Sequence, residues 1–361
     1  MARSPLTVRS VVARAVNVPM ARPLQTGGGT IASMPLVLID LMTDQGIVGR
    51  SYVFCYTPAA AGPTAQLVQN IGAWLQSDAV APADIERKLQ KRFRLLGAQG
   101  LTGIAMAGID SAAWDALAKA QKLPLVRLLG GTARPIPAYN SCGLGLMGEA
   151  RAAVEAAELA RGFRAVKLRL GYGDWKTDIG VVRAVRRAVG DVDVMVDYNQ
   201  ALDVPEAIKR AHTLDDENLL WIEEPTLAED YIGHAAIAAA ARTPIQIGEN
   251  WWGSHEMQKS LAARASDFIM PDAVKIGGVT GWLRAIGLAE AAGLPISSHL
   301  FPEISAHLLA ISPGAHWLEY VDWAAPILIS PARVVNGAVL ANDTPGAGIE
   351  WDEAAVGRFA M

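Results

Sequence analysis

The sequence predicts an α/β fold, a modified (β/α)7β TIM-like barrel preceded by an α+β capping domain. From Lys167 to Glu319, short apolar runs end in a polar residue, and from Asp197 onward the intervals between these residues are 20 to 27 residues. The stretches between these runs have the apolar periodicity of helices. One strand and one helix per step is the pattern of a parallel barrel, whose active site lies where the strands end.

Composition bounds the class of protein. The 361 residues are 51% hydrophobic with a net charge of −4 and no basic run, which supports a large core and argues against nucleic acid as a partner. Two cysteines, Cys55 and Cys142, are too few for a disulfide scaffold, so a reducing cytoplasm is the expected location. No apolar run reaches about 18 residues and no export signal is visible, so we expect no membrane partner.

Residues 1–133 are predicted to form the capping domain. The expected strands are Thr7–Val18, Pro35–Leu41 and Ile47–Phe54, and the expected helices are Pro63–Gln76, Ala83–Leu96 and Leu101–Ala120. Residues 22–34 join the first two strands through three consecutive glycines, which predicts a mobile loop. This loop is either a plain hairpin connection or, because apolar Leu24 and Ile31 flank the glycines, a lid over the substrate.

Residues 134–320 are predicted to form the catalytic barrel, whose first strand begins near Ile136. Asp203 before Val204-Pro205 is a helix start signal between two of the strands. After Glu319 the periodicity fades. Residues 321–361 are therefore expected to be a C-terminal segment that packs back on the capping domain.

Three acidic residues predict a metal site. Asp197, Glu223 and Glu249 follow three consecutive predicted strands. Because neighbouring strands lie about 4.8 Å apart, their carboxylates converge, and they repel one another unless a cation lies between them. Oxygen ligands without cysteine or histidine favour Mg²⁺, with Mn²⁺ as the alternative. A helix cap or a surface ion pair would explain any one of them alone.

Polar residues beside these acids extend the candidate site. Asn199 is two residues past Asp197 and is expected to orient a ligand or the substrate. Glu224 is expected to point away from the metal as a supporting or structural acid. Lys275 follows Asp272 closely and is expected to neutralise it.

A histidine and a carboxylate predict a proton-transfer pair. His299 and Asp272 end adjacent predicted strands, so the carboxylate would fix the tautomer of the imidazole and raise its basicity. A lone histidine in an apolar stretch is usually structural, which is how we interpret His307 and His316.

Two cations and one acid complete the predicted polar set. Lys167 and Arg169 are two residues apart on one strand, so both point into the barrel, toward a bound carboxylate and the metal site. Glu319 on the last strand is a hydrogen-bond donor if burial keeps it protonated.

The chain resembles the enolase superfamily, and within it the mandelate racemase/muconate lactonizing enzyme family, over almost its whole length. The segments that carry the resemblance are Ala165–Lys167, Met195–Gln200, Trp221–Thr226, Gly248–Trp251, Pro271–Trp282, Ser297–Phe301 and His316–Glu319. The resemblance implies that Mg²⁺ chelates the carboxylate and the 2-hydroxyl group of a small substrate, and that a base removes the α-proton to give an enediolate. It also implies a homo-oligomer, an octamer in the family.

The resemblance implies a role for each candidate residue. The metal ligands are Asp197, Glu223 and Glu249. The base is His299 with Asp272, Lys167 and Glu319 stabilise the charge that develops on the substrate carboxylate, and Ser141 and Asn199 form the polar side of the substrate site.

Two positions depart from the family pattern. Arg169 stands where the family's racemase has a second lysine that acts as the base on the other face. Deprotonating a free lysine at pH 7 costs about 4–5 kcal/mol, whereas a free arginine costs about 7 kcal/mol or more. Cys142 stands where the racemase has a histidine beside the serine that corresponds to Ser141. Two-base chemistry is therefore in question, while the His299 half is intact.

The resemblance also implies the residues of the lid and walls of the pocket, and all of them are apolar or aromatic: Leu24, Ile31, Phe54, Tyr56, Leu300 and Val321. Core packing would explain any single one of them. A sugar acid would need hydrogen-bond partners there, because an unmatched buried hydroxyl costs about 1–3 kcal/mol. The set favours a racemase of mandelate or a similar aryl or apolar 2-hydroxy acid. The alternatives are a one-base dehydratase of hydroxy acids such as acid sugars, using His299, and a catalytically weak homologue that binds carboxylates.

Overall fold

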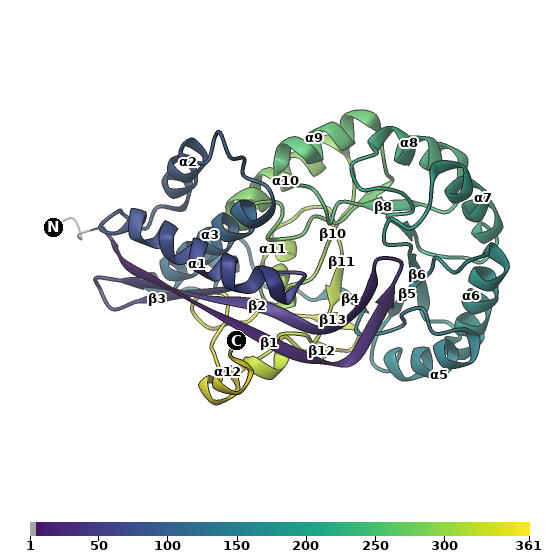
Figure 1. Cartoon of the computed structure of the whole chain (residues 1–361), viewed down its shortest axis with the longest axis horizontal. Helices are drawn as coiled ribbons and strands as arrows, with labels where there is room; N and C mark the ends of the chain where they lie inside the picture. The colour runs from purple at the N-terminus through teal and green to yellow at the C-terminus, as the bar shows by residue number, and fades with distance from the viewer. Residues whose placement is uncertain (1–4) are drawn as a thin grey trace.

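The structure, a computed structural model, describes residues 5–361 and consists of an antiparallel sheet with helices beside a closed barrel (Figure 1). The antiparallel sheet has the order β1-β2-β3, formed by Val8–Thr26, Gly29–Thr43 and Val48–Phe54. Its strands lie where the sequence predicts them, and β1 is much longer than expected. Alternating buried residues such as Val16 and Val18 place one face of β1 in the core.

Residues 22–34 form a paired hairpin, which agrees with the hairpin alternative of the sequence analysis, and the strands extend further into this segment than expected. β1 continues to Thr26 and β2 begins at Gly29, with Leu24 paired to Ile31. Leu24 is only 3% exposed, so the extended strands have an apolar side chain to bury, and only Gly27 and Gly28 form the turn. A Cβ at Gly27 would lie 2.8 Å from the Cβ of Ala201, so the tip of the hairpin rests on the loop after β6, over the open end of the barrel (Figure 1).

The helices of the N-terminal part pack on this sheet. They are α1 (Pro58–Leu75), α2 (Pro82–Arg92), α3 (Gly100–Ala120) and the short α4 (Leu125–Leu128). Helix α1 begins earlier than predicted because Pro58, rather than Pro63, occupies the first helical position, where a missing N–H costs nothing. Helix α2 ends at Arg92 and leaves Leu95 and Leu96 exposed beyond it.

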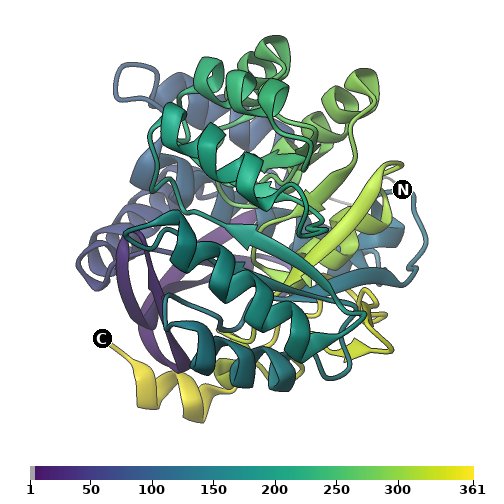
Figure 2. The same cartoon turned by 90° about the vertical axis from the view of Figure 1, so that its right-hand side faces the viewer.

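The barrel alternates strands and helices along the chain, as the sequence predicts. Its elements are β4 (Ile136–Asn140), α5 (Glu149–Leu159), β5 (Ala165–Arg169), α6 (Trp175–Val189), β6 (Asp193–Asp197), α7 (Val204–Leu214), β7 (Ile222–Glu223), α8 (Tyr231–Ala240), β8 (Ile245–Ile247), α9 (Ser254–Ala263), β9 (Phe268–Ile269), α10 (Gly278–Ala292), β10 (Ile296–Ser298), α11 (Pro302–Ala310) and β11 (Ala315–Tyr320). Neighbouring strands are parallel, and β11 pairs with β4 to close the ring (Figure 2). The (β/α)7β barrel is therefore confirmed.

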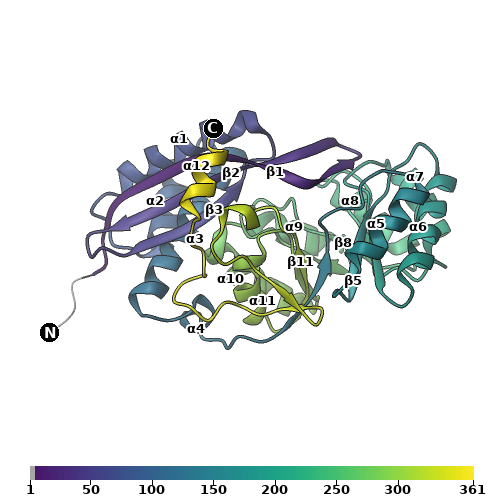
Figure 3. The ribbon, with the colours of Figure 1, turned by 90° about the horizontal axis from the view of Figure 1, so that it is seen from below.

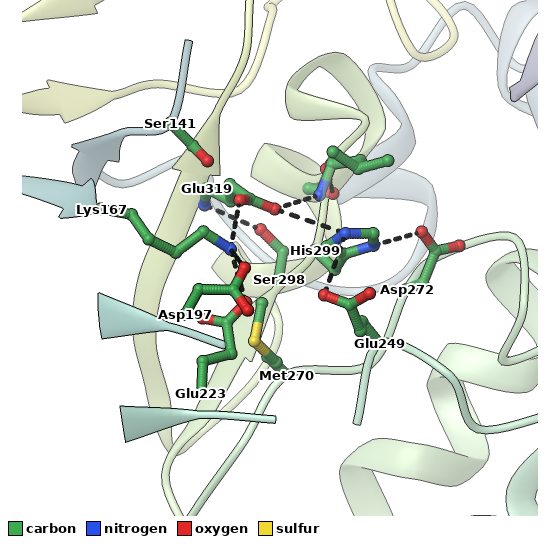
Figure 4. A network of polar contacts seen from close by, with 12 residues as sticks. Ser141, Lys167, Asp197, Glu223, Glu249, Met270, Asp272, Ser298, His299 and Glu319 are labelled. Atoms are coloured by element: carbon green, nitrogen blue, oxygen red, sulfur yellow. Dashed lines mark hydrogen bonds and ion pairs between the residues drawn. The ribbon is translucent and has the colours of Figure 1, made fainter. Parts of the chain in front are cut away.

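The barrel interior is polar at the carboxyl ends of the strands and apolar in the layer beneath them. Its lower layer is a cluster of Tyr139, Ala165, Met195, Trp221 and Trp317. The carboxyl ends of the strands carry the acidic and basic candidates above this layer (Figure 4). Within residues 5–361, no helix is long and apolar enough to cross a membrane.

The C-terminal segment touches both parts of the molecule (Figure 3). It contains a 3-10 helix (Ala325–Ile327), β12 (Val334–Val335), β13 (Ala338–Val339) and α12 (Glu353–Phe359). Strand β13 pairs antiparallel with β4 of the barrel. Trp351 donates from Nε1 to Asp40 of β2 at 2.9 Å, and Arg14 of β1 pairs with Glu353.

Packing between β3 and α3 gives a test of the capping fold. A Cβ at Gly49 would lie 2.0 Å from the carbonyl oxygen of Ala112 and 2.8 Å from the Cβ of Ala116. We expect Gly49→Ala to lower the free energy of unfolding by about 2 kcal/mol or more, because strand and helix must separate. Urea unfolding measures this. In the control Gly62→Ala, the new methyl group on α1 meets nothing within 4 Å, so stability should stay equal or rise by up to about 1 kcal/mol. Equal stability of the two variants would contradict the packing.

Candidate active site

Three carboxylates converge at the carboxyl ends of β6, β7 and β8. Asp197 and Glu223 are register partners at the ends of their strands, and Glu249 follows β8. One oxygen from each of the three lies within 4.8 Å of the others. Mg–O distances of about 2.1 Å place ligand oxygens about 3–4 Å apart around the ion, so this set of hard donors fits a small divalent cation. These are the three residues that the sequence analysis predicts as a metal site.

Neighbouring side chains hold two of these carboxylates in place. Asn199 donates to Asp197 from its backbone N–H at 2.7 Å and from Nδ2 at 3.0 Å. Its Oδ1 is buried and has no hydrogen-bond partner, so an acceptor remains available for a substrate. Trp221 donates from Nε1 to Oε2 of Glu223 at 3.0 Å. The sequence analysis missed Trp221, although its position two residues before Glu223 on one strand places both inside the barrel.

The ammonium of Lys167 lies among the acids (Figure 4). Its Nζ is 3.3 Å from Oδ2 of Asp197, 2.8 Å from Oε1 of Glu319 and in hydrogen-bond contact with Glu223. Burial alone would lower the pKa of Lys167, but these carboxylates raise it well above its ordinary value. The three carboxylates therefore favour the charged form of Lys167 in this arrangement.

The pKa values of two of the acids that contact Lys167 shift in opposite directions. Burial raises the pKa of Glu223, and the attraction of Lys167 only partly offsets this. Burial also acts to raise the pKa of Glu319, but Lys167 and His299 together bring it below its ordinary value. Glu319 accepts a hydrogen bond from the backbone N–H of Leu300 at 2.9 Å, as an ionised carboxylate does. Its two cationic neighbours therefore favour the ionised form of Glu319 in this arrangement, whereas burial alone would favour the protonated form.

His299 and Asp272 form the expected pair. Nδ1 of His299 is 2.7 Å from Oδ2 of Asp272, whose other oxygen accepts the backbone N–H groups of Val274 and Lys275. Asp272 therefore fixes the ring so that Nε2 faces the metal cluster, 3.4 Å from Oε2 of Glu249. Burial lowers the pKa of His299, but Glu249, Glu319 and Asp272 outweigh this and raise it to about 9.

Arg169 is held by hydrogen bonds to the loop after β4. Its Nη1 donates to the carbonyl of Gly143 at 2.8 Å and weakly to that of Ser141 at 3.3 Å, and its Nη2 donates to Oγ of Ser141 at 2.7 Å. Its Nε is 4.0 Å from Oδ2 of Asp197. The guanidinium thus fixes the loop after β4, and Ser141, expected on the substrate side, accepts a hydrogen bond from it.

The apolar candidates lie on four different parts of the chain. Leu24 and Ile31 face each other in the β1–β2 hairpin. The rings of Phe54, at the end of β3, and Tyr56 are tilted against each other with centroids 4.3 Å apart. Leu300 directly follows His299, and Val321 directly follows β11; both are buried. Trp323, which the sequence analysis missed, lies 6.1 Å from Phe54 between ring centroids. Trp323 lies two residues after Val321, and this spacing is the sequence signal that could have identified it.

Three other expectations are resolved by side-chain contacts. Nδ1 of His307 accepts the backbone N–H of Val126, and the ring of His316 lies 4.9 Å from that of Phe268, so both histidines are structural as expected. Lys275 contacts Asp272 only through its backbone N–H, because its ammonium donates to Oδ1 of Asn250 at 2.6 Å. The expectation that Lys275 neutralises Asp272 is therefore wrong.

Comparisons with curated proteins find dehydratases and cycloisomerases. The chain is 31% identical over 331 residues to L-talarate/galactarate dehydratase of Salmonella typhimurium strain LT2, covering 90% of this chain and 82% of the relative. It is 30% identical to 3,6-anhydro-alpha-L-galactonate cycloisomerase of Streptomyces coelicolor, covering 92% of this chain and 93% of the relative.

Solved structures share the fold over the full chain. An enolase from Bradyrhizobium, complexed with magnesium and mandelic acid, is 46% identical with a TM-score of 0.94 and covers 99% of both chains. An enolase from the alphaproteobacterium bal199, with bound magnesium, is 43% identical with a TM-score of 0.96, covering 99% of this chain and 100% of that one.

Two sequence families match the chain in succession. Residues 8–130 match the N-terminal domain of the mandelate racemase / muconate lactonizing enzyme family. Residues 149–355 match the family described as enolase C-terminal domain-like. The carboxylate cluster, the His299–Asp272 pair and these matches lead to one conclusion: the chain belongs to the enolase superfamily, with the domain organisation of the mandelate racemase / muconate lactonizing enzyme family.

Proposed function

We propose that this protein is a Mg²⁺-dependent enzyme that removes the α-proton of a 2-hydroxycarboxylate. The observation that carries the proposal is the position of His299, whose Nε2 lies 3.4 Å from Glu249 of the carboxylate cluster while Asp272 holds Nδ1. The donor set fits a hard divalent ion, and the Bradyrhizobium and bal199 proteins both hold magnesium. When bound, Mg²⁺ supplies positive charge that stabilises the enediolate form of the substrate.

Each polar residue has a defined task in this proposal. Asp197, Glu223 and Glu249 would hold the ion. Nε2 of His299 accepts the α-proton, and Asp272 stabilises the imidazolium that results. Lys167 supplies a fixed charge beside the substrate carboxylate, and Asn199 offers its free Oδ1 to a substrate hydroxyl.

The contacts of Arg169 favour chemistry on one face of the substrate. Its terminal nitrogens are engaged by Ser141 and Gly143, and a guanidinium gives up a proton only at high cost. We therefore place dehydration first. His299 takes the C2 proton, the C3–O bond breaks, and the hydroxyl leaves as water with the proton that His299 returns. The enol that remains tautomerises to a 2-keto acid. The 31% identity to L-talarate/galactarate dehydratase supports this order.

Racemisation of an aryl 2-hydroxy acid is the second candidate. The adjacent rings of Phe54 and Tyr56, with Trp323 beside Phe54, favour an aromatic substrate over a polyhydroxylated one. The Bradyrhizobium protein that is 46% identical binds mandelic acid. Racemisation needs a proton acceptor on each face, and Arg169 would have to serve the second one.

Proton exchange in D₂O tests both candidates. The separate R and S enantiomers of mandelate are incubated with the protein and Mg²⁺, and NMR follows loss of the α-hydrogen. Exchange of one enantiomer without inversion, together with 2-keto acid formation from acids that carry a 3-hydroxyl, supports dehydration. Exchange and inversion of both enantiomers supports racemisation. If the protein binds such acids but exchanges the α-hydrogen of none of them, the proposal of an enzyme is refuted and a carboxylate-binding protein remains.

Removal of the proposed base gives a direct test. We expect His299→Asn to slow α-proton exchange by about 10²–10⁴-fold, because that is the usual contribution of a general base. The exposed His255 on α9 is the matched control, and His255→Asn should leave the rate unchanged. If His299→Asn retained the rate of the parent protein, another group would be the base.

The pH dependence of the exchange rate tests the state of His299. As a base His299 must be neutral, so the rate should fall as the pH drops below its pKa. That pKa is raised to about 9 by Glu249, Glu319 and Asp272, and Mg²⁺ on Glu249 should reduce the increase. We expect kcat/KM to rise with pH to an inflection below 9. Asp272→Asn should move this inflection to lower pH and reduce the limiting rate. An inflection that Asp272→Asn leaves in place would show that another group titrates.

A further inference from the structure

A second series of polar contacts begins at Glu249 of the carboxylate cluster and does not include Lys167. Glu224 is 1% exposed, and Asn250 donates from Nδ2 to both of its carboxylate oxygens at 3.0 and 2.8 Å. The same Nδ2 lies 3.3 Å from Oε1 of Glu249. Asn250 therefore bridges a buried acid and one of the proposed metal ligands.

Lys275 extends this series of contacts to the antiparallel sheet. Its ammonium donates to Oδ1 of Asn250 at 2.6 Å and lies 4.3 Å from the centroid of the Tyr56 ring. A second ring, that of Trp252, is 6.0 Å away. Tyr56 belongs to the segment between β3 and α1, so this contact joins the capping part of the molecule to the barrel.

We propose that Asn250 and Lys275 are positioning residues that hold Glu249 for the metal ion and couple the metal site to the Tyr56 wall of the substrate pocket. The proposal rests on the proposed function, because it takes Glu249 as a Mg²⁺ ligand. Substrate packed on Tyr56 and metal held by Glu249 would then strengthen each other's binding through Lys275.

A simple counter-ion role for Lys275 fits the geometry less well. A counter-ion to Glu224 would lie against its carboxylate, and among residues 5–361 Lys275 makes no ion pair within 4.0 Å. Instead, the amide of Asn250 separates them, with its oxygen on Lys275 and its nitrogen on Glu224. An asparagine held at both ends is fixed in orientation, which is what a neighbour of a metal ligand requires.

Mg²⁺ titration calorimetry on the full chain, after removal of metal with a chelator, tests the positioning role. Asn250→Ala changes no charge, and we expect it to raise the Kd for Mg²⁺ about tenfold or more, the usual effect of removing a group that orients a ligand. Lys275→Met distinguishes two effects because they change the Kd for Mg²⁺ in opposite directions. Loss of a repelling positive charge would lower the Kd, whereas loss of positioning would raise it, and we expect it to rise.

Variants of Tyr56 test the coupling across the two parts of the molecule. Tyr56→Leu removes the ring that Lys275 faces and should raise the Kd for Mg²⁺ about threefold, although Tyr56 is not a metal ligand. Tyr56→Phe keeps the ring and should bind Mg²⁺ as the parent protein does. Thermal unfolding of the metal-free proteins should give the same Tm for both variants, which separates positioning from a loss of folding.

The outcomes separate this inference from the proposed function. Absence of Mg²⁺ binding by the parent protein would refute the metal site itself. Binding by the parent with an unchanged Kd in Asn250→Ala would refute positioning alone. An unchanged Kd in Tyr56→Leu, or a lower Kd in Lys275→Met, would refute the coupling through Lys275.

Discussion

Repulsion among buried carboxylates is the constraint on which the rest of this structure depends. Four acids meet at the end of the barrel, and Asp197, Glu223 and Glu319 are each no more than 1% exposed. Water cannot screen such charges, so positive groups must lie between them. Lys167 touches three of the acids, and the imidazole of His299 lies between Glu249 and Glu319. The same arrangement creates a strong affinity for a divalent cation.

Much of the fold could be predicted because the barrel repeats a local pattern. Several strands end in a candidate residue or are followed by one, and parallel register alone brings Asp197 beside Glu223 and Asp272 beside His299. The length of the two hairpin strands was underestimated for a physical reason. Glycine favours loops locally, but Leu24 gains more by pairing with Ile31 and being buried, and that burial depends on distant residues.

The part of the site that could not be predicted lies in side chains with a choice of partners. Arg169 follows Lys167 by two residues and was expected to face the substrate, yet its fork of donors matches the carbonyls of the loop after β4. Lys275 likewise faces an amide and a ring instead of the nearest acid. The partners of a long cationic side chain depend on the groups that surround it in the folded protein. The spacing of residues in the sequence does not specify these groups.

The C-terminal segment has a consequence for the order in which the protein is made. Glu350 pairs with Arg50 of β3, and Trp351 bonds to Asp40 of β2, across about 300 residues of chain. The first sheet leaves the ribosome early but gains these contacts only after the whole barrel has emerged. Until then the sheet formed by β1, β2 and β3 exposes groups that the finished molecule covers. The last contacts of the first sheet to be made are thus late events in biosynthesis.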